Sequence, residues 1–172
     1  MEVHTLTSES ALTELRKYII KPSIKKNIYL MSGLLVLIGI IAFFTKSYLL
    51  TIFCFLGIDI FFLELYVLSK KQIQMTLKRL RELYGTDKIE GKLVFENNTL
   101  RTVNFVTNGE LPLRYEVMAL FAETQNYYAL FTKEHQALIV DKQQFTPETK
   151  EQFLQLVHEK MPALLIKPRK GK

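Results

Sequence analysis

Two long apolar runs dominate the pattern of hydrophobic positions along this chain. The first covers residues 28–44 and the second residues 48–68, and only Thr45, Lys46 and Ser47 separate them. A hydrocarbon core of about 30 Å needs about 20 helical residues, so each run is long enough for one span. A single buried helix would place Lys46 in the middle of the hydrocarbon. The pattern therefore predicts a transmembrane hairpin of two helices over residues 27–68.

Shorter amphipathic segments flank the predicted hairpin on both sides. Residues 1–26 contain the stretch TSESALTELRKYI, which places Leu12, Leu15 and Ile19 on one helical face, followed by a basic flank. Residues 69–85 repeat apolar side chains at helical spacing from Ile73 to Tyr84, with a basic opposite side. We expect an N-terminal helix that ends at Pro22, and a basic juxtamembrane helix that ends at Gly85.

From about residue 88 the period changes from helical to alternating. Six short strands follow, and the first turn falls at Glu96-Asn97-Asn98, where Asn97 and Asn98 can adopt the positive φ of a tight hairpin. A last helix begins with Thr146 as a cap and Pro147 at its first position. The chain is thus predicted to be a membrane α+β protein. Residues 86–172 would form a small antiparallel β domain with a C-terminal helix, in the order of pleckstrin-homology-like (PH-like) folds.

Basic residues cluster at the two ends of the hairpin that lie away from its tip. The formal net charge is +6. Because cytoplasmic flanks of membrane spans carry an excess of Lys and Arg, both termini should face the cytoplasm. Such cations also favour an anionic inner leaflet, and the basic tail 167–172 would add to this attraction. The candidate contacts to anionic lipid are Lys25, Lys26, Lys70, Lys71, Lys78, Arg79 and Arg81.

Two acidic residues, Asp59 and Glu64, interrupt the second apolar run. Antiparallel packing about Lys46 would place Asp59 level with Ser32, and Glu64 near the inner surface within reach of lysine or water. A mid-span aspartate costs about 2.5–3.5 kcal/mol on insertion scales. Three interpretations of Asp59 stay open: a protonated or Ser32-bonded structural contact, a contact with a partner protein or a second copy, and ion or proton conduction.

The rest of the chain carries few residues that suggest chemistry. One Cys and three scattered histidines form no recognisable metal-ligand spacing. No nucleophile elbow, zinc-protease motif or phosphate-binding glycine loop is present. The sequence therefore predicts no enzyme, no cofactor and no metal site. Nucleic-acid binding is disfavoured too, because the basic residues border the apolar spans and lack an accompanying aromatic platform.

Several stretches of the chain resemble the YcxB-like family, which comprises small membrane proteins of Gram-positive bacteria. An N-terminal LTSESALTELRKYIIKPSIKK precedes the two spans, and LPLRYEVMALFAETQNYYALFTKEHQALIVDKQQFT precedes a closing ETKEQFLQLVHEK. The chain departs from the family pattern at Tyr115-Glu116-Val117-Met118 and at Asp141-Lys142, where the family has Pro-Lys. The resemblance implies a bacterial plasma membrane and a cytoplasmic β domain, and it supplies no catalytic residues.

The leading hypothesis is a non-enzymatic membrane subunit. Its cytoplasmic domain would dock a protein partner or sense the inner membrane surface, in contact with the lipid bilayer. The alternative is a small oligomeric transport or permeability component in which Asp59 titrates.

Overall fold

The computed structural model describes residues 1–167 of the chain. It contains two compact units. The β unit combines residues 1–15 with the chain from residue 75 onward, and the helical unit consists of residues 16–74. The segment ahead of the two long helices is therefore divided between the units at Leu15.

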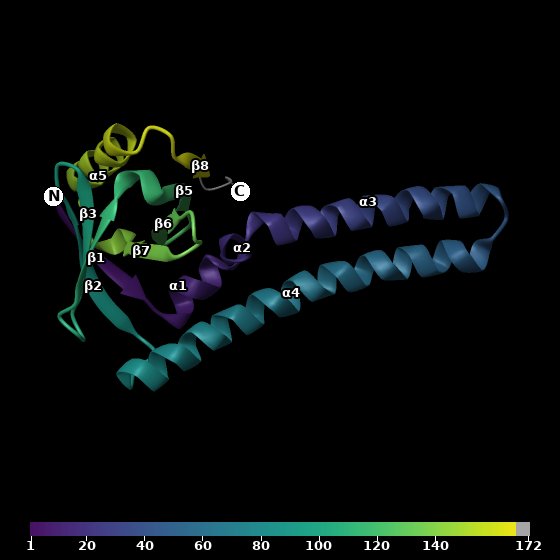
Figure 1. Cartoon of the computed structure of the whole chain (residues 1–172), viewed down its shortest axis with the longest axis horizontal. Coiled ribbons are helices and arrows are strands. Elements are labelled where there is room, and N and C mark those ends of the chain that lie inside the picture. Colours follow the sequence, from purple (N-terminus) through teal and green to yellow (C-terminus); the bar gives the residue numbers. More distant parts are fainter. Residues whose placement is uncertain (168–172) are drawn as a thin grey trace. The chain divides into compact units, whose positions relative to one another are not determined.

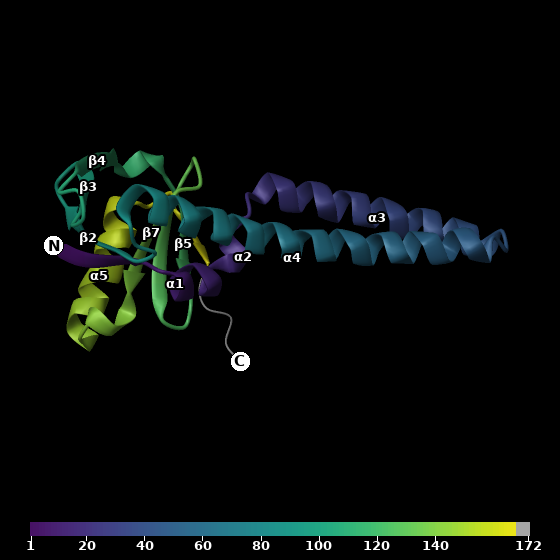
Figure 2. The same ribbon diagram turned by 90° about the horizontal axis from the view of Figure 1, so that it is seen from below.

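The helical unit contains the predicted antiparallel pair of long helices (Figure 1). A short helix α2 (Arg16–Ile19) leads into α3 (Pro22–Phe44), and α4 (Tyr48–Tyr84) returns beside it, as both views show (Figures 1 and 2). Pro22 is the first residue of α3, where its missing N–H has no helical partner to lose. Lys46 makes the tight connection in a left-handed conformation, with φ of 59°.

Both long helices expose most of their apolar side chains. Their most apolar 18-residue windows have mean hydropathies of 2.2 in α3 and 2.1 in α4, and only 17% and 6% of these windows are buried. A core helix of a soluble protein is largely covered by other elements, which these helices are not. Each is long and apolar enough to cross a membrane.

The side chains between α3 and α4 agree with the predicted pairing. The rings of Tyr29 and Phe62 lie 6.3 Å apart between centroids. A Cβ at Gly57 would lie 3.1 Å from Cδ1 of Leu35, so Gly57 allows the two helices a close approach. Gly33, in contrast, has no neighbour within 4 Å of its Cβ position. Gly33 therefore does not bring the two helices into close contact beside Ser32.

Residues 69–85 do not begin a new helix. They continue α4 without a break to Tyr84. Gly85 ends it with φ of 69°, and its N–H donates to the Arg81 carbonyl at 2.9 Å. Ile73 and Leu77, on the predicted apolar face, are both buried.

The β unit is built on one eight-stranded mixed sheet in the order β4-β3-β2-β1-β7-β6-β5-β8. The predicted C-terminal helix is present as α5, with the Thr146 cap and the first-turn proline in place. The strands are β1 (Glu2–Thr7), β2 (Ile89–Phe95), β3 (Thr99–Asn104), β4 (Glu110–Arg114), β5 (Met118–Glu123), β6 (Tyr127–Thr132), β7 (Ala137–Asp141) and β8 (Leu165–Lys167). The helices of this unit are α1 (Glu9–Glu14), α5 (Pro147–Lys160) and the short turns η1 (Tyr115–Val117) and η2 (Lys142–Gln144).

The six predicted strands are joined by two that the sequence pattern did not indicate. β1 pairs antiparallel with β2 over six residue pairs, from Glu2 with Val94 to Thr7 with Ile89. It also contacts β7 where Thr5 lies opposite Val140. The strand before the two long helices and the strand after them are thus neighbours in one sheet.

The second additional strand, β8, makes the sheet mixed rather than purely antiparallel. It runs parallel to β5 and places Leu165 opposite Leu120. Two further expectations are corrected. Asn97 and Asn98 do not adopt positive φ, and the asparagine that does is Asn108, with φ of 53°. The predicted single N-terminal helix is divided into α1 and α2 at Leu15, a fully buried residue.

The core of the β unit lies between the sheet and α5. Phe153, which is fully buried, projects from α5 into a cluster of aromatic rings. Its ring centroid lies 5.6 Å from that of Tyr128, 5.9 Å from that of Phe95 and 5.1 Å from that of Phe145. These distances are typical of favourable aromatic pairs.

The opposite face of the sheet meets α1. The hydroxyls of Ser10 and Tyr127 lie 3.1 Å apart, and Glu14 accepts hydrogen bonds from the backbone N–H of Asn126 at 2.7 Å and from its side chain at 3.0 Å. Burial alone would raise the pKa of Glu14, but these hydrogen bonds together with that of Thr124 lower it. With both faces covered, every residue of β6 is buried.

Replacing Tyr128 by Phe is expected to stabilise the β unit at high pH. The Tyr128 hydroxyl is buried and has no hydrogen-bond partner among the described residues. Burial, aided by the negative charge of Glu123, raises the pKa of Tyr128 from 10.0 to about 12. Folding therefore favours the protonated phenol, and about 2–3 kcal/mol of stability should be lost as pH rises from about 10 through about 12. Tyr128→Phe should abolish this loss.

An ultraviolet titration of tyrosinate in the full chain checks the prediction. The wild-type protein should contain one more late-titrating phenol than Tyr128→Phe. Partial burial also raises the pKa of Tyr115, so a smaller late phase remains in that variant. Tyr48→Phe, which removes an exposed tyrosine, serves as the matched control and should leave the full late phase in place. A late phase of wild-type amplitude in Tyr128→Phe would contradict the assignment.

Candidate functional site

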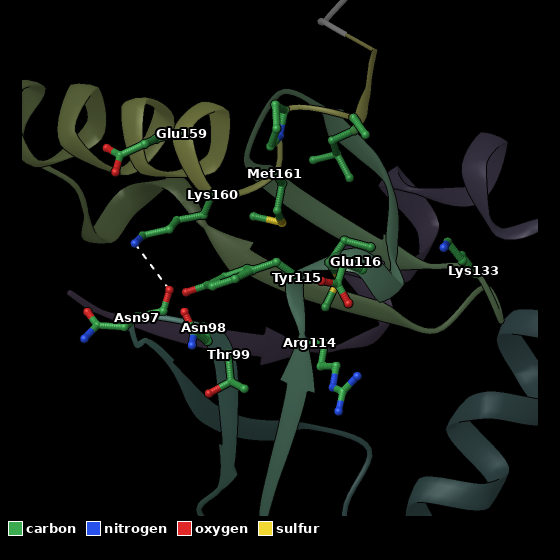
Figure 3. Close-up of a pocket in the computed structure, with 14 residues that line it drawn as sticks. Asn97, Asn98, Thr99, Arg114, Tyr115, Glu116, Lys133, Glu159, Lys160 and Met161 are labelled. Atoms are coloured by element: carbon green, nitrogen blue, oxygen red, sulfur yellow. Dashed lines mark hydrogen bonds between the residues drawn. The ribbon is translucent and has the colours of Figure 1, made fainter.

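A hollow with a volume of about 850 Å³ opens in the β unit between the β2–β3 turn, η1 and the end of α5. Figure 3 shows how its side chains converge from these elements. The sequence brings them together because β3 and β4 form a hairpin whose far end leads directly into η1. The lining residues are Asn97, Asn98, Thr99, Arg114, Tyr115, Glu116, Met118, Lys133, Glu159, Lys160, Met161, Pro162, Ala163 and Leu164.

Hydrogen bonds to the β2–β3 turn fix two of the lining side chains. The Tyr115 hydroxyl donates to the Glu96 carbonyl at 2.7 Å, and the Lys160 ammonium donates to the Asn97 carbonyl at 3.4 Å, drawn as a dashed line in Figure 3. Partial burial and the nearby Glu96 charge raise the pKa of Tyr115, and its hydrogen bond offsets part of that shift. Tyr115 therefore stays a neutral donor at physiological pH.

The floor of this hollow is apolar and its rim is charged. Met118, Met161 and Leu164 are buried beneath it. Cations and carboxylates both surround the floor. The charged lining residues are Arg114, Lys133, Lys160, Glu116 and Glu159.

The residues that line the hollow include no histidine, cysteine or serine. Ser–His and Cys–His pairs are therefore missing from its described lining. Across residues 1–167, no three His, Cys, Asp or Glu side chains are grouped closely enough to hold a metal ion.

The three intramembrane candidates from the sequence are not brought together. Ser32 is buried and its hydroxyl has no hydrogen-bond partner among the described residues. Asp59 and Glu64 are both exposed. The hydrogen bond expected as one interpretation, from Ser32 to Asp59, is therefore absent from the described structure. Asp59 instead lies on the outside of the helical pair.

The predicted lipid contacts divide into two groups. Lys25 and Lys70 lie close to the Arg16 and Tyr66 region of the helical unit. The others are exposed along α3 and α4; they are Lys26, Lys71, Lys78, Arg79 and Arg81. Two of these make ion pairs, Lys78 with Glu82 at 3.6 Å and Arg81 with Asp87 at 2.9 Å. In the basic tail, residues 168–172 lie outside the described part of the chain.

Sequence reasoning did not predict the hollow or its lining. Its residues come from segments more than sixty positions apart, such as Asn97 and Lys160. No local motif connects such segments. One sequence feature pointed to this region, the apolar run from Met161 to Leu164 directly after the last helix. Such a run needs a surface to pack against.

A scan of known protein families matches residues 95–157 to the family described as YcxB-like protein. The matched segment begins at the end of β2 and runs through most of α5. No curated protein and no solved structure matches the chain.

Proposed function

Because the chain belongs to the YcxB-like family through residues 95–157, we propose that it is an integral membrane protein of the bacterial plasma membrane. Its β unit would dock a protein partner at the inner surface, as a non-enzymatic regulatory subunit. The observation that carries this proposal is the pairing of β1 with β2 on either side of the helical hairpin.

That pairing constrains the way the chain meets a bilayer. β1 ends at Thr7 and β2 begins at Ile89, so the two long helices are an insertion between adjacent strands. A folded sheet cannot have neighbouring strands on opposite sides of a membrane. If α3 and α4 span it, both ends of the pair must lie on the β unit's side. The basic flanks favour the cytoplasmic side.

The strand order supports a PH-like fold for the β unit. Strands β1–β4 form one meander and β5–β7 another, and β1 joins them by pairing with both β2 and β7. A C-terminal helix, α5, then packs over the core. This is the order of a bent, partly open barrel closed by a helix, as in PH-like modules.

The hollow beside η1 is the proposed docking site. Its buried methionine floor can receive an apolar side chain, and its mixed rim can pair with charges of either sign on a partner. Arg114 and Lys133 are exposed at the rim, so substitutions there should weaken docking without disturbing the core.

The test combines topology with co-purification. In a Cys54→Ala background, single cysteines at Ser10 and Gln155 should react with an impermeant reagent only from the cytoplasmic side. A cysteine at Lys46 should react only from outside. Reaction of positions 10 and 155 from opposite sides would refute the insertion topology.

For docking, the tagged protein is extracted from its own membranes in mild detergent and the stoichiometric partner identified. Arg114→Glu together with Lys133→Glu should deplete that partner by about tenfold or more, since each reversed rim charge adds repulsion. Lys150→Glu, an exposed α5 position that does not line the hollow, is the matched control. Equal recovery with all variants would exclude this site.

The outward position of Asp59 favours a second candidate, a small oligomeric transport component. A carboxylate facing lipid costs about 2.5–3.5 kcal/mol, and contact with a second copy or another membrane protein would reduce this cost.

Asp59→Asn is expected to leave the protein level unchanged and to reduce recovery of the partner or oligomer. Loss of a transport phenotype at normal partner recovery would favour the transport function. Unchanged recovery and unchanged transport would show that Asp59 has no part in either function.

A further inference from the structure

A second, smaller hollow lies within the helical unit, where α2 leads into α3 beside α4. Its volume is about 290 Å³. All of its lining residues belong to residues 16–74, so the helical unit forms it alone. They are Arg16, Lys17, Ile20, Lys25, Tyr29, Leu65, Tyr66 and Ser69.

The polar lining of this hollow is cationic. Arg16, Lys17 and Lys25 contribute three positive charges, and its described lining contains no acidic residue. Lys70 adds a fourth cation beside the Tyr66 ring. The ion pairs formed among residues 1–167 include neither Arg16 nor Lys70. Arg16 and Lys70 therefore bring positive charge to a site whose described lining has no carboxylate.

Contacts within the unit hold these cations in place. The Arg16 guanidinium lies 4.4 Å and the Lys70 ammonium 5.2 Å from the centre of the Tyr66 ring, both within cation–π range. The Lys25 ammonium donates to the Lys17 carbonyl. Arg16 and Lys70 also interact by hydrogen bonding with the Tyr66 side chain. The Arg16 guanidinium has five N–H donors in all, so it can still donate to a ligand, and its fixed position reduces the entropy lost on binding.

The position of the hollow matches the depth of lipid headgroups. Tyr29 stands at the start of the apolar run of α3, and Tyr66 near the end of the apolar run of α4. Tyrosines at such positions mark the membrane–water interface. Arg16 precedes α3 and Lys70 follows the apolar part of α4, so the cations lie at the polar edge of the predicted spans.

We propose that this hollow is a phosphoryl-binding site that takes the headgroup phosphate of an anionic membrane lipid. The planar fork of Arg16 can hold two phosphate oxygens at once, and Lys70 supplies a point charge beside it. Tyr29 and Leu65 would contact the glycerol and upper acyl region. The inference rests on the proposed membrane insertion, and it adds a discrete ligand site to the diffuse attraction of the basic flanks.

Neighbouring residues offer a matched control. Lys71 is next to Lys70 and carries the same charge. Neither lysine lines the hollow, but Lys70 lies over the Tyr66 ring at its edge and Lys71 does not. A delocalised attraction responds equally to the loss of either lysine. A discrete site responds to Lys70→Gln and Arg16→Gln, and much less to Lys71→Gln.

The experiment uses the full chain. Membrane insertion is first established by resistance to alkaline extraction, so a failure of the proposed function appears before any lipid is added. Native mass spectrometry then follows the purified protein in detergent during titration with phosphatidylglycerol. One lipid is expected to bind saturably to the wild-type protein. Its affinity should fall about tenfold or more in Arg16→Gln and in Lys70→Gln, because each substitution removes one charge-assisted hydrogen bond. Lys71→Gln should change affinity less than about twofold.

Three results would overturn the proposal. One is an equal loss of affinity in Lys70→Gln and Lys71→Gln, which indicates diffuse charge. Another is retention of phosphatidylglycerol by Arg16→Gln and Lys70→Gln at wild-type affinity. The third concerns inorganic phosphate, whose binding is measured by phosphorus NMR. The proposal fails if Arg16→Gln and Lys70→Gln weaken the binding of phosphate but leave the binding of phosphatidylglycerol unchanged. That last result would assign the site to a soluble phosphoryl group.

Discussion

Replacing Phe153 by Ala is expected to destabilise the β unit by about 3–5 kcal/mol, the range for truncation of a buried phenylalanine. Phe153 is fully buried and contacts the rings of Phe95, Tyr128 and Phe145. Removing the ring leaves a cavity between α5 and the sheet that rigid β-strands cannot readily fill. Hydrogen exchange in the detergent-solubilised full chain measures the loss, as faster exchange of the β6 amides.

His158 provides the matched control on the same helix, because it is exposed. His158→Ala should change the free energy of opening by less than about 0.5 kcal/mol. Amides of α3 should exchange at wild-type rates in both variants, since neither residue belongs to the helical unit. Unchanged β6 protection in Phe153→Ala would mean that α5 does not complete the core.

Replacing Val3 by Asp should be comparably severe, at about 3–5 kcal/mol, the cost of a buried charge that has no partner. Val3 is 1% exposed and lies opposite Leu93 in the β1–β2 ladder. The substitution acts on a segment that precedes the helical hairpin, yet the loss is expected in β2, β7 and α5. Hydrogen exchange and limited proteolysis of the full chain report it.

His4→Asp is the matched control for Val3→Asp, since His4 is the next residue of β1 and its side chain is exposed. It should leave the protection of β2 close to wild type. If Val3→Asp instead destabilised only residues 1–15, β1 would not be an integral strand of the sheet, and the insertion topology would lose its support.

Local patterns were sufficient for much of this fold. The helical hairpin followed from two apolar runs joined by three polar residues, and β2 through β7 followed from alternation between turns. The α5 cap followed from Thr146 and Pro147, whose side chains act within one turn of the helix. Each of these elements depends on residues close together in the sequence.

β1 and β8 show what local patterns miss. β1 contains one buried residue, Val3, and pairs with a strand more than eighty positions away. β8 is three residues long and all three residues are classed as exposed, so it has no alternation of buried and exposed positions to detect. The positive φ expected at Asn97 and Asn98 arose at Asn108 instead, because turn geometry depends on the register of the flanking strands as well as on residue type.

The two hollows could not be predicted from the sequence for the same reason. Lys25 and Lys70 could be identified as basic flanks. The pairing of Arg16 with Tyr66 is visible only in the structure, where the guanidinium on α2 lies 4.4 Å from the centre of the ring on α4. The hollow beside η1 likewise depends on a hydrogen bond from Lys160 to Asn97. The outward position of Asp59 depends on helix rotation, which spacing alone did not determine.

The place of β1 in the sheet has a consequence for biosynthesis. β1 is made before the two long helices, and its partner β2 is translated only after both helices have been synthesised. β1 must therefore stay unpaired during that time, and the sheet can close only afterwards. A fragment that begins after α4 would lack a central strand and expose the edges of β2 and β7 to aggregation. A single protease cut after α4 would not separate the β unit from the helical hairpin either, because β1 would still connect them.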